Sequence, residues 1–329
     1  MKRRLINIPV AVVAALMLLS ACEVEFSPNA QWKEVPVVYC VLDQDDDTTW
    51  IRVEKCFLGE DNLYMYSSES DSFNYPQGSI AVSLLEYRDG ALRNTIDAQY
   101  TLRPREEGNF AAGQQPVYFT TAHLDERNMY QLEVRRTADQ SILATTEPIP
   151  LITREASQSL FVKPTRYEIF QFNGPSLSME WVPFENARQY QPIARFYYAE
   201  AGDTMHVDIK APAVNSGNSG GHVGTSLSRR AFLEEIYLAL KDDTATKTYL
   251  KKVDLYLTAC DENLNVYINN VNSGSMTGQD RETYTNIQGG KGVFGARRTH
   301  LYRSMKADSS LVPPDGLHYL LKQLEVGFE

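Results

Sequence analysis

Cysteine and histidine are scarce in this chain of 329 residues. It has four cysteines, Cys22, Cys40, Cys56 and Cys260, and five histidines. So few cysteines exclude a disulfide-based scaffold. No His-Glu-x-x-His or Cys-x-x-Cys motif occurs, so the sequence predicts no zinc site and we expect no cofactor.

An excess of positive charge is also missing. The formal net charge is −10. Residues 1–21 carry a charge of +3 from Lys2, Arg3 and Arg4, so residues 22–329 have a formal net charge of −13. Such an acidic protein is not suited to bind nucleic acid or an anionic lipid surface, because its field repels both.

A long apolar run is found only at the N-terminus, where Val10 to Leu19 follows the three basic residues. This is the pattern of a signal peptide, and the run is too short to span a membrane. Leu19-Ser-Ala-Cys22 resembles the lipobox of bacterial lipoproteins, in which the leader is removed before the cysteine and the cysteine is acylated. We predict a signal peptide over residues 1–21, lipid attachment at Cys22 and a polar tether over 22–34.

Short runs of strand character, separated by turn signals, follow as far as residue 148. There are seven: 35–42, 50–57, 79–88, 92–101, 116–121, 129–136 and 141–146. This number and length favour an immunoglobulin-like β-sandwich over residues 35–148. Tyr130, which starts one run just after a turn, resembles the tyrosine corner of such sandwiches, whose hydroxyl binds the upstream backbone. The alternative is a tyrosine that only packs.

Pro148 and Pro150 interrupt this pattern and mark a predicted domain boundary. Residues 149–329 are expected to form a second β-rich domain. Its predicted strands are 161–172, 177–182, 193–199, 204–210 and 249–258, and apolar stripes at helical spacing predict helices near 228–241, 261–271 and 315–325. The expected fold class is therefore mainly β, an immunoglobulin-like sandwich followed by a β-rich domain with a few α-helices.

Two cysteines lie on the arms of one predicted hairpin. If Leu42 faces Trp50 in that hairpin, Cys40 faces Arg52 rather than Cys56. We therefore expect buried free thiols instead of a disulfide.

Two segments imitate a trypsin-like serine protease. Thr120-Thr-Ala-His123 resembles the motif around the catalytic histidine, Gly217-Asn-Ser219-Gly-Gly resembles the nucleophile loop, and Asp139 lies between them. However, an amphipathic helix is predicted after Ser219, where the protease fold needs a strand. His123 and Ser219 also lie on opposite sides of the predicted boundary, so we expect no catalytic site and no enzyme.

Asp43, Asp45, Asp47 and Glu54 occupy positions 1, 3, 5 and 12 of an EF-hand-like pattern. Thr48 stands where that loop needs glycine, and both flanks are predicted strands. A solvated acidic hairpin tip is the favoured interpretation, with weak calcium binding as the alternative.

Aromatic side chains are abundant, with 19 Tyr, 13 Phe and 3 Trp. Most are expected in the core or in cross-strand pairs. Tyr64 and Tyr66 lie in a polar stretch and are the candidates for exposed ligand binding. The glycines between 289 and 295 spell G-x-G-x-x-G, but the βαβ context of a dinucleotide site is missing, so we predict roles in turns and close backbone approach.

Four segments, Val37–Asp43, Ile51–Gly59, Asp71–Tyr75 and Tyr284–Gly295, give the chain a family resemblance when combined with the lipobox. In this order they resemble a family of Bacteroidota outer-membrane lipoproteins of unknown function. The resemblance implies a two-part, β-rich exported lipoprotein of a group associated with TonB-dependent transport. It supplies no catalytic residues.

The sequence thus predicts a non-enzymatic binding or assembly role at the outer membrane. The membrane is the first expected partner, through lipidated Cys22, and an outer-membrane transporter or another envelope protein is the second. A surface glycan-binding lipoprotein, a fimbrial or assembly subunit and the serine protease are the alternatives. The residues after Cys22 leave open whether the protein faces the periplasm or the cell surface.

Overall fold

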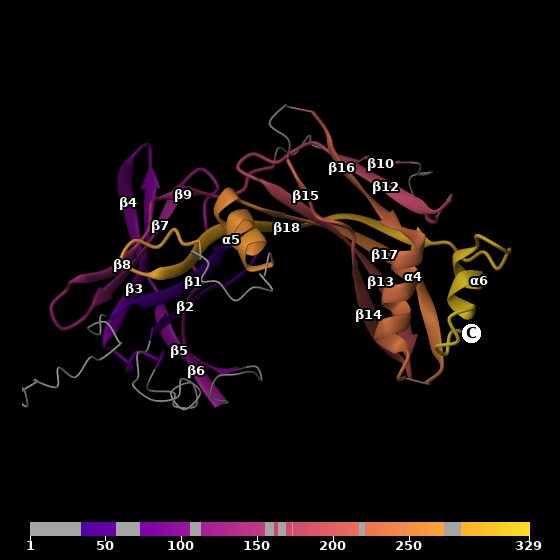
Figure 1. The fold of residues 1–329 in the computed structure, drawn as a ribbon, viewed down its shortest axis with the longest axis horizontal. Helices are drawn as coiled ribbons and strands as arrows, with labels where there is room; N and C mark the ends of the chain where they lie inside the picture. Colours follow the sequence, from indigo (N-terminus) through magenta and orange to yellow (C-terminus); the bar gives the residue numbers. More distant parts are fainter. Residues whose placement is uncertain are drawn as a thin grey trace, which may run out of the picture.

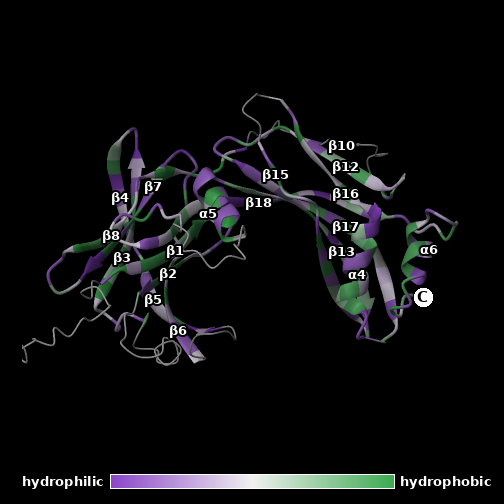
Figure 2. Cartoon of the chain, viewed as in Figure 1, coloured by the Kyte–Doolittle hydropathy of each residue, from purple (hydrophilic) through white to green (hydrophobic). Residues whose placement is uncertain are grey.

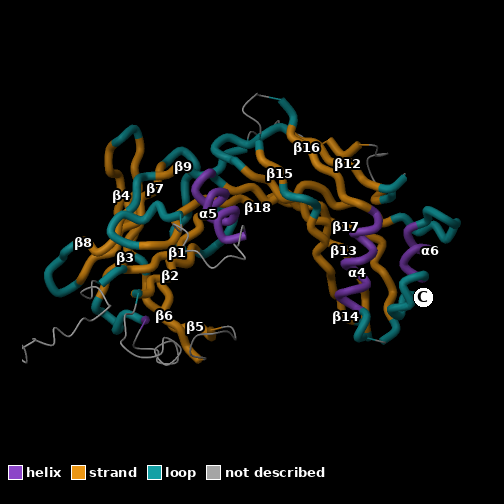
Figure 3. The backbone as a smooth tube through the Cα atoms, in the orientation of Figure 1, coloured by secondary structure: helices purple, strands orange, loops and turns teal. Residues whose placement is uncertain are grey.

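The structure is a computed structural model that describes residues 34–56, 73–105, 113–154, 161–163, 169–172, 174–216, 221–243, 245–272 and 284–329. Strands dominate and helices are few, which confirms the predicted mainly β class (Figure 3). Two lobes lie side by side and are joined by one long strand (Figure 1). The predicted signal peptide, the lipid site at Cys22 and the predicted tether except for Glu34 lie outside the described residues.

The N-terminal lobe is built from nine strands and the start of a later one. The nine are β1 (Pro36–Leu42), β2 (Thr49–Lys55), β3 (Ile80–Arg88), β4 (Ala91–Asp97), β5 (Gln99–Arg105), β6 (Gly113–Thr120), β7 (Met129–Arg136), β8 (Ile142–Thr145) and β9 (Ile149–Pro150). One sheet has the order β4-β3-β7-β8, with β9 also paired to β7, and the other contains β1-β2-β6-β5.

These two sheets share one core because their strands alternate between buried and more exposed residues. Val38 and Leu42 of β1, Leu84 of β3 and Val134 of β7 are almost fully buried in the same cluster. Figure 2 shows the same alternation of hydrophobic and hydrophilic residues along the strands. A two-sheet lobe is therefore present, whereas its immunoglobulin-like character stays a prediction.

The single strand predicted over 92–101 is wrong. The chain changes sheets at Ala98, so β4 pairs with β3 in one sheet while β5 pairs with β6 in the other. The amide of Ala98 donates to the carbonyl oxygen of Val82 at 2.9 Å, which holds the crossing point. Neither glycine nor proline marks this corner in the sequence.

The C-terminal lobe also contains two sheets, together with helices. Its strands are β10 (Phe161–Lys163), β11 (Ile169–Phe170), β12 (Ser176–Trp181), β13 (Gln189–Glu200), β14 (Asp203–Lys210), β15 (Val214–Asn215), β16 (Val223–Ser228) and β17 (Lys247–Cys260). The order β10-β12-β16 forms the small sheet, and β14-β13-β17 continues the large one. Rings of Phe170, Phe172, Phe196 and Phe232 meet in its core.

Three helices are described: α4 (Arg229–Leu240), α5 (Glu262–Asn272) and α6 (Leu317–Lys322). They lie at the predicted positions, although α6 is shorter than the span 315–325. Ser228 caps α4 as its sequence indicates, since the hydroxyl accepts the amide of Ala231. Among the described residues, none of the helices has the length and apolar character needed to cross a membrane.

The strand β18 (Lys291–Ala307) joins the two lobes. Residues 291–296 pair in parallel with β1, and residues 297–305 pair antiparallel with β17. One sheet of order β14-β13-β17-β18-β1-β2-β6-β5 therefore passes through both lobes. The boundary predicted at residue 148 does not account for this strand, because the first lobe takes part of its sheet from the far end of the chain.

Close backbone approach explains the glycines at the start of β18. Gly292 has φ +110°, and a Cβ there would lie 1.9 Å from the carbonyl oxygen of Val38. A Cβ at Gly295 would lie 2.9 Å from a carboxylate oxygen of Asp261. These glycines let β18 run beside β1 and beneath α5.

Each lobe also has a tyrosine that fixes the turn before one of its strands. The hydroxyl of Tyr130 accepts the amide N–H of Asp125 at 2.7 Å, which confirms the predicted bond to the upstream backbone. The hydroxyl of Tyr190, at the start of β13, accepts the amide N–H of Phe184 at 2.6 Å. The second corner was not predicted.

Candidate functional site

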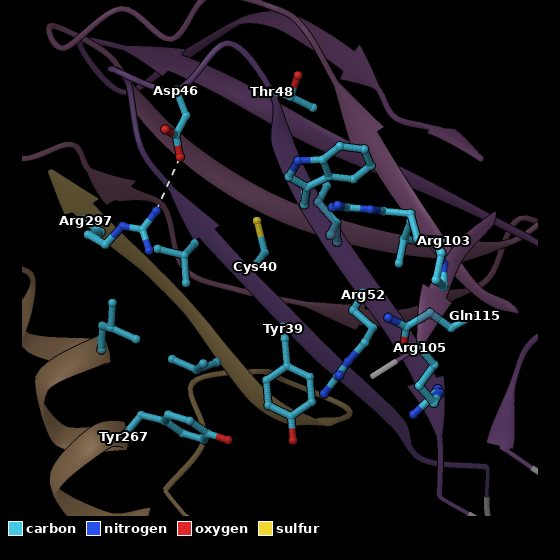
Figure 4. A pocket seen from close by; sticks show the side chains of 17 residues that line it. Tyr39, Cys40, Asp46, Thr48, Arg52, Arg103, Arg105, Gln115, Tyr267 and Arg297 are labelled. Carbon is cyan, nitrogen blue, oxygen red and sulfur yellow. Dashed lines mark hydrogen bonds and ion pairs between the residues drawn. The ribbon is translucent and has the colours of Figure 1, made fainter. Parts of the chain in front are cut away.

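A groove of about 840 Å³ opens on the outer face of the large sheet in the N-terminal lobe. Strands β1, β2, β5 and β6 form one part of it, and α5 with the start of β18 forms the other (Figure 4). We call it the arginine groove, defined by the side chains of Tyr39, Trp50, Arg52, Arg103, Arg105, Gln115 and Tyr267.

Strand alternation aims these side chains outward. In β1 and β2 the core takes Val38, Cys40, Ile51 and Val53, so the residues between them face the groove. The register pairs Tyr39 with Arg52 and Cys40 with Ile51. The predicted pairing of Cys40 with Arg52 is therefore wrong by one residue.

Guanidinium groups lie over aromatic rings along this groove. The Cζ atom of Arg52 is 4.5 Å from the ring centre of Tyr39, and that of Arg103 is 4.4 Å from the ring centre of Trp50. Trp50 is 40% exposed. Such stacking satisfies the flat faces of a guanidinium and leaves its N–H edges available for hydrogen bonds.

Only some of these arginines are hydrogen-bonded to a nearby carboxylate. Glu54 binds Arg105 at 2.6 Å, while its other oxygen lies 3.9 Å from Nε of Arg52, beyond hydrogen-bond distance. Arg103 makes no ion pair within the described residues. Nε of Arg52 and Oε1 of Gln115 are buried, and within the same part of the chain they have no hydrogen-bond partner. The groove therefore contains unsatisfied donors and an unsatisfied acceptor.

The helix α5 closes one side of the groove with Tyr267. Its ring meets that of Tyr39 edge to face, with the centres 6.1 Å apart. Burial, together with a hydrogen bond to the Tyr39 hydroxyl, raises the pKa of Tyr267 to about 12. The phenol of Tyr267 thus stays neutral at physiological pH and can donate or accept hydrogen bonds.

The acidic tip between β1 and β2 pairs with arginines rather than forming a calcium loop. Asp43 binds Arg297 at 3.2 Å and Asp45 binds Arg298 at 3.1 Å. Glu54 is separated from the tip along β2 and is engaged by Arg105. The candidate set Asp43, Asp45, Asp47 and Glu54 does not converge, and no cluster of three or more potential metal ligands occurs among the described residues.

The structure does not assemble the candidate protease triad either. His123 precedes β7 and Asp139 follows it, so the length of this strand, about 25 Å, separates them. The carboxylate of Asp139 accepts the hydroxyl and the amide of Ser141, at 2.6 and 3.0 Å. Ser219 lies outside the described residues.

All three cysteines that the structure describes are free thiols. Cys40 and Cys260 are buried as predicted, and burial raises the pKa of the Cys260 thiol to about 12. Cys56 is exposed, contrary to the prediction. Cys40 belongs to the core beneath the groove, and burial raises its pKa as well, so it is a weak nucleophile.

Sequence reasoning missed the residues of the arginine groove. The available signal was the alternation Trp50-Ile-Arg52-Val-Glu54, which shows an aromatic and charged outer face opposite a buried one. The aromatic candidates chosen instead, Tyr64 and Tyr66, lie outside the described residues. Cross-strand contacts such as Arg103 over Trp50 depend on a register that the sequence does not reveal.

Comparison of the chain with protein-family models and with curated proteins gives no match. The argument for function therefore depends on the geometry and chemistry of the arginine groove.

Proposed function

We propose that this chain is an outer-membrane lipoprotein, attached through Cys22, whose role is binding rather than catalysis and whose arginine groove is the ligand-binding site. The observation that carries the proposal is the pair of stacked guanidinium groups, Arg52 and Arg103, whose hydrogen-bonding edges are not used by carboxylates of the described residues. A concave surface with aromatic walls and a few unsatisfied polar groups is typical of ligand sites.

Binding is favoured over catalysis by the chemistry that the groove displays. The groove and its rim carry arginines, tyrosines, the buried thiol of Cys40 and carboxylates already paired with arginine. Arginine binds anions well but does not exchange protons at physiological pH. These groups suit capture of a ligand.

The partners that we propose follow from the predicted anchor. A tether of residues 22–34 would let the groove work within about 40 Å of the membrane surface. That reach suits a protein that captures a ligand beside an outer-membrane transporter and supports the predicted link to TonB-dependent uptake.

The anchor is tested with Cys22→Ser in cells. We expect the wild-type chain in the membrane fraction and the variant in the soluble fraction, because acyl chains supply the membrane affinity. Cys56→Ser, which removes an exposed thiol elsewhere, is the matched control and should stay with the membrane. Membrane retention of the Cys22→Ser chain would contradict the proposed attachment.

The groove is tested through the fluorescence of Trp50. The mature chain, in detergent, is titrated with acidic and neutral envelope polysaccharides and with peptidoglycan fragments. We expect saturable quenching in the wild-type chain, and isothermal titration with the same ligand should show binding that is lost in Trp50→Ala. Tyr237→Ala removes a side chain of similar exposure, 44% against 40%, on α4 and should bind normally. If both variants bind equally, or no member of the panel gives a Trp50-dependent signal, the groove is not the binding site.

A further inference from the structure

We infer that the arginine groove binds an acidic oligosaccharide, with sugar carboxylates held by Arg52 and Arg103. This inference rests on the proposed function and specifies its ligand class. A guanidinium stacked on a ring is held in place, and its coplanar N–H groups match the two oxygens of a carboxylate. Arg52 over Tyr39 and Arg103 over Trp50 supply two such anion sites in one groove.

The C-terminal lobe shows what these side chains look like when the protein supplies its own anion. There the Cζ atom of Arg195 lies 5.0 Å from the ring centre of Tyr256, and two of its nitrogens bind the Asp208 carboxylate at 2.7 Å each. Arg52 and Arg103 have the same stacking without that bidentate partner in the described residues. The guanidinium groups of Arg52 and Arg103 are therefore two sites at which the carboxylate of a ligand can bind.

Gln115 extends the chemistry from a carboxylate to a sugar. This residue lines the groove, and its side-chain oxygen is buried and has no donor in the described part of the chain. A buried acceptor is costly unless a donor reaches it. A carboxylate cannot donate, whereas the hydroxyl groups of a sugar acid can, so a sugar acid matches the arginines together with an amide side chain better than a simple carboxylate does.

The floor of the groove favours a saccharide over an acidic peptide. It is the face of a sheet in which β1 pairs with β2, β5 pairs with β6, and β2 pairs with β6 from Thr49 to Ile51. Peptides that add to a sheet bind through free main-chain groups at an edge. The side chains that line this groove include aromatic rings and guanidinium groups, against which sugar rings and their carboxylates can lie.

The position of this positive charge adds to the argument. Residues 22–329 carry −13, so the chain as a whole repels anions. In the groove, Glu54 balances only part of the charge of the arginines that lie over aromatic rings. The groove is therefore a local region of positive charge on an acidic protein. Capture of an acidic ligand should therefore be local and weakened by salt.

The test is isothermal titration of the detergent-solubilised mature chain with a hexamer of galacturonic acid. A neutral galactose hexamer and an oligoglutamate peptide of equal charge are the comparison ligands. We expect binding of the acidic sugar alone, about tenfold weaker in Arg52→Gln and in Arg103→Gln. Arg195→Gln is the matched control, because its stacked guanidinium is already occupied, and it should bind as the wild type does. Circular dichroism verifies that each variant folds.

The outcomes separate two claims, that the groove is a binding site and that its ligand is an acidic saccharide. Trp50-dependent binding of the neutral hexamer, or unchanged affinity in both arginine variants, overturns the acidic ligand and leaves the groove as a binding site. Equal affinity for oligoglutamate overturns the saccharide and retains the anion sites. Binding that neither Trp50 nor the two arginines influence overturns the proposed function itself.

Discussion

Tyr130 in the N-terminal lobe and Tyr190 in the C-terminal lobe occupy equivalent positions, each buried at the start of a strand that follows a turn. Both hydroxyls accept an upstream amide N–H, from Asp125 and from Phe184. The surroundings differ, since Tyr130 also donates to Glu86 at 3.0 Å, whereas the corner of Tyr190 is fully buried. The same local device thus begins a core strand in both halves.

The outer faces of the two lobes differ more than their corners. In the C-terminal lobe Arg195 is bound by Asp208, and Lys252 is bound by Asp254 at 2.9 Å. In the N-terminal lobe Arg52 and Arg103 lie on rings without such bonds among the described residues. These two cations of the C-terminal lobe are neutralised by the protein itself, whereas the two stacked arginines of the N-terminal lobe are the groups on which the proposed binding function rests.

The largest effect is expected where the lobes are joined. Gly292→Ala places a Cβ against the carbonyl oxygen of Val38 and forces alanine to a φ of +110°, so the seam between β1 and β18 must open. We expect a loss of about 3 kcal/mol or more in the free energy of unfolding. Gly90→Ala, also at positive φ but with open space, should lose only about 1 kcal/mol. If urea denaturation gave equal losses of unfolding free energy for Gly292→Ala and Gly90→Ala, the positive φ rather than the contact with Val38 would explain the effect at Gly292.

The two tyrosine corners should differ in strength. Tyr190→Phe leaves the amide of Phe184 without an acceptor in a buried setting, and we expect a loss of about 2 kcal/mol. Tyr130→Phe exposes its orphaned amide to partial solvation, so about 1 kcal/mol is expected. Thermal and urea unfolding of both variants measure this order, and a larger loss for Tyr130→Phe would reverse the comparison.

The smallest effect concerns Asp261, the carboxylate that accepts the amide of Leu264 at the start of α5. Burial raises its pKa from 3.8 to about 6. Because the folded-state pKa is raised, its contribution to stability is present below about pH 4 and is lost as the pH rises through 6. Asp261→Asn keeps the cap without the charge and should exceed the wild type by about 1 kcal/mol at pH 7.5, but not at pH 4.

Asp208 supplies the opposite case for comparison. The hydrogen bonds from Arg195 hold the pKa of this carboxylate below its usual value. Its contribution is therefore present at neutral pH and is lost on acidification. Asp208→Asn should lower the melting temperature at pH 7.5 and have little effect at acid pH. If the stability of Asp261→Asn and of Asp208→Asn, relative to the wild type, changed with pH in the same direction, burial of Asp261 and hydrogen bonding of Asp208 would not be the causes of their pKa shifts.

Local patterns foretold the elements that depend on neighbours in sequence. Alternation located β1, β2 and β7, and Ser228 followed by an apolar stripe located α4. The split at Ala98 was missed because residues on both sides continue a strand pattern without a turn residue. The strand β18 was not predicted, although turns and close backbone approach were expected for its glycines, because the strand that they approach, β1, lies about 250 residues earlier in the chain.

The candidate site was largely hidden from the sequence for the same reason. Arg52, Arg103 and Trp50 come from two strands separated by β6, and a shift of one residue in register would turn them into the core. The acidic tip, in contrast, was foreseen as a surface turn. Its pairing with Arg297 and Arg298 was not, because those arginines lie on β18.

The passage of β18 through both lobes has a consequence for the order of folding. The first lobe receives the strand beside β1 from residues 291–296, so its sheet cannot be completed until most of the chain has been synthesised. Until then β1 has an unpaired edge of the kind that adds to other chains. An N-terminal fragment ending at residue 148 would keep that edge permanently. The half of the protein that is made first thus waits for residues close to the C-terminus.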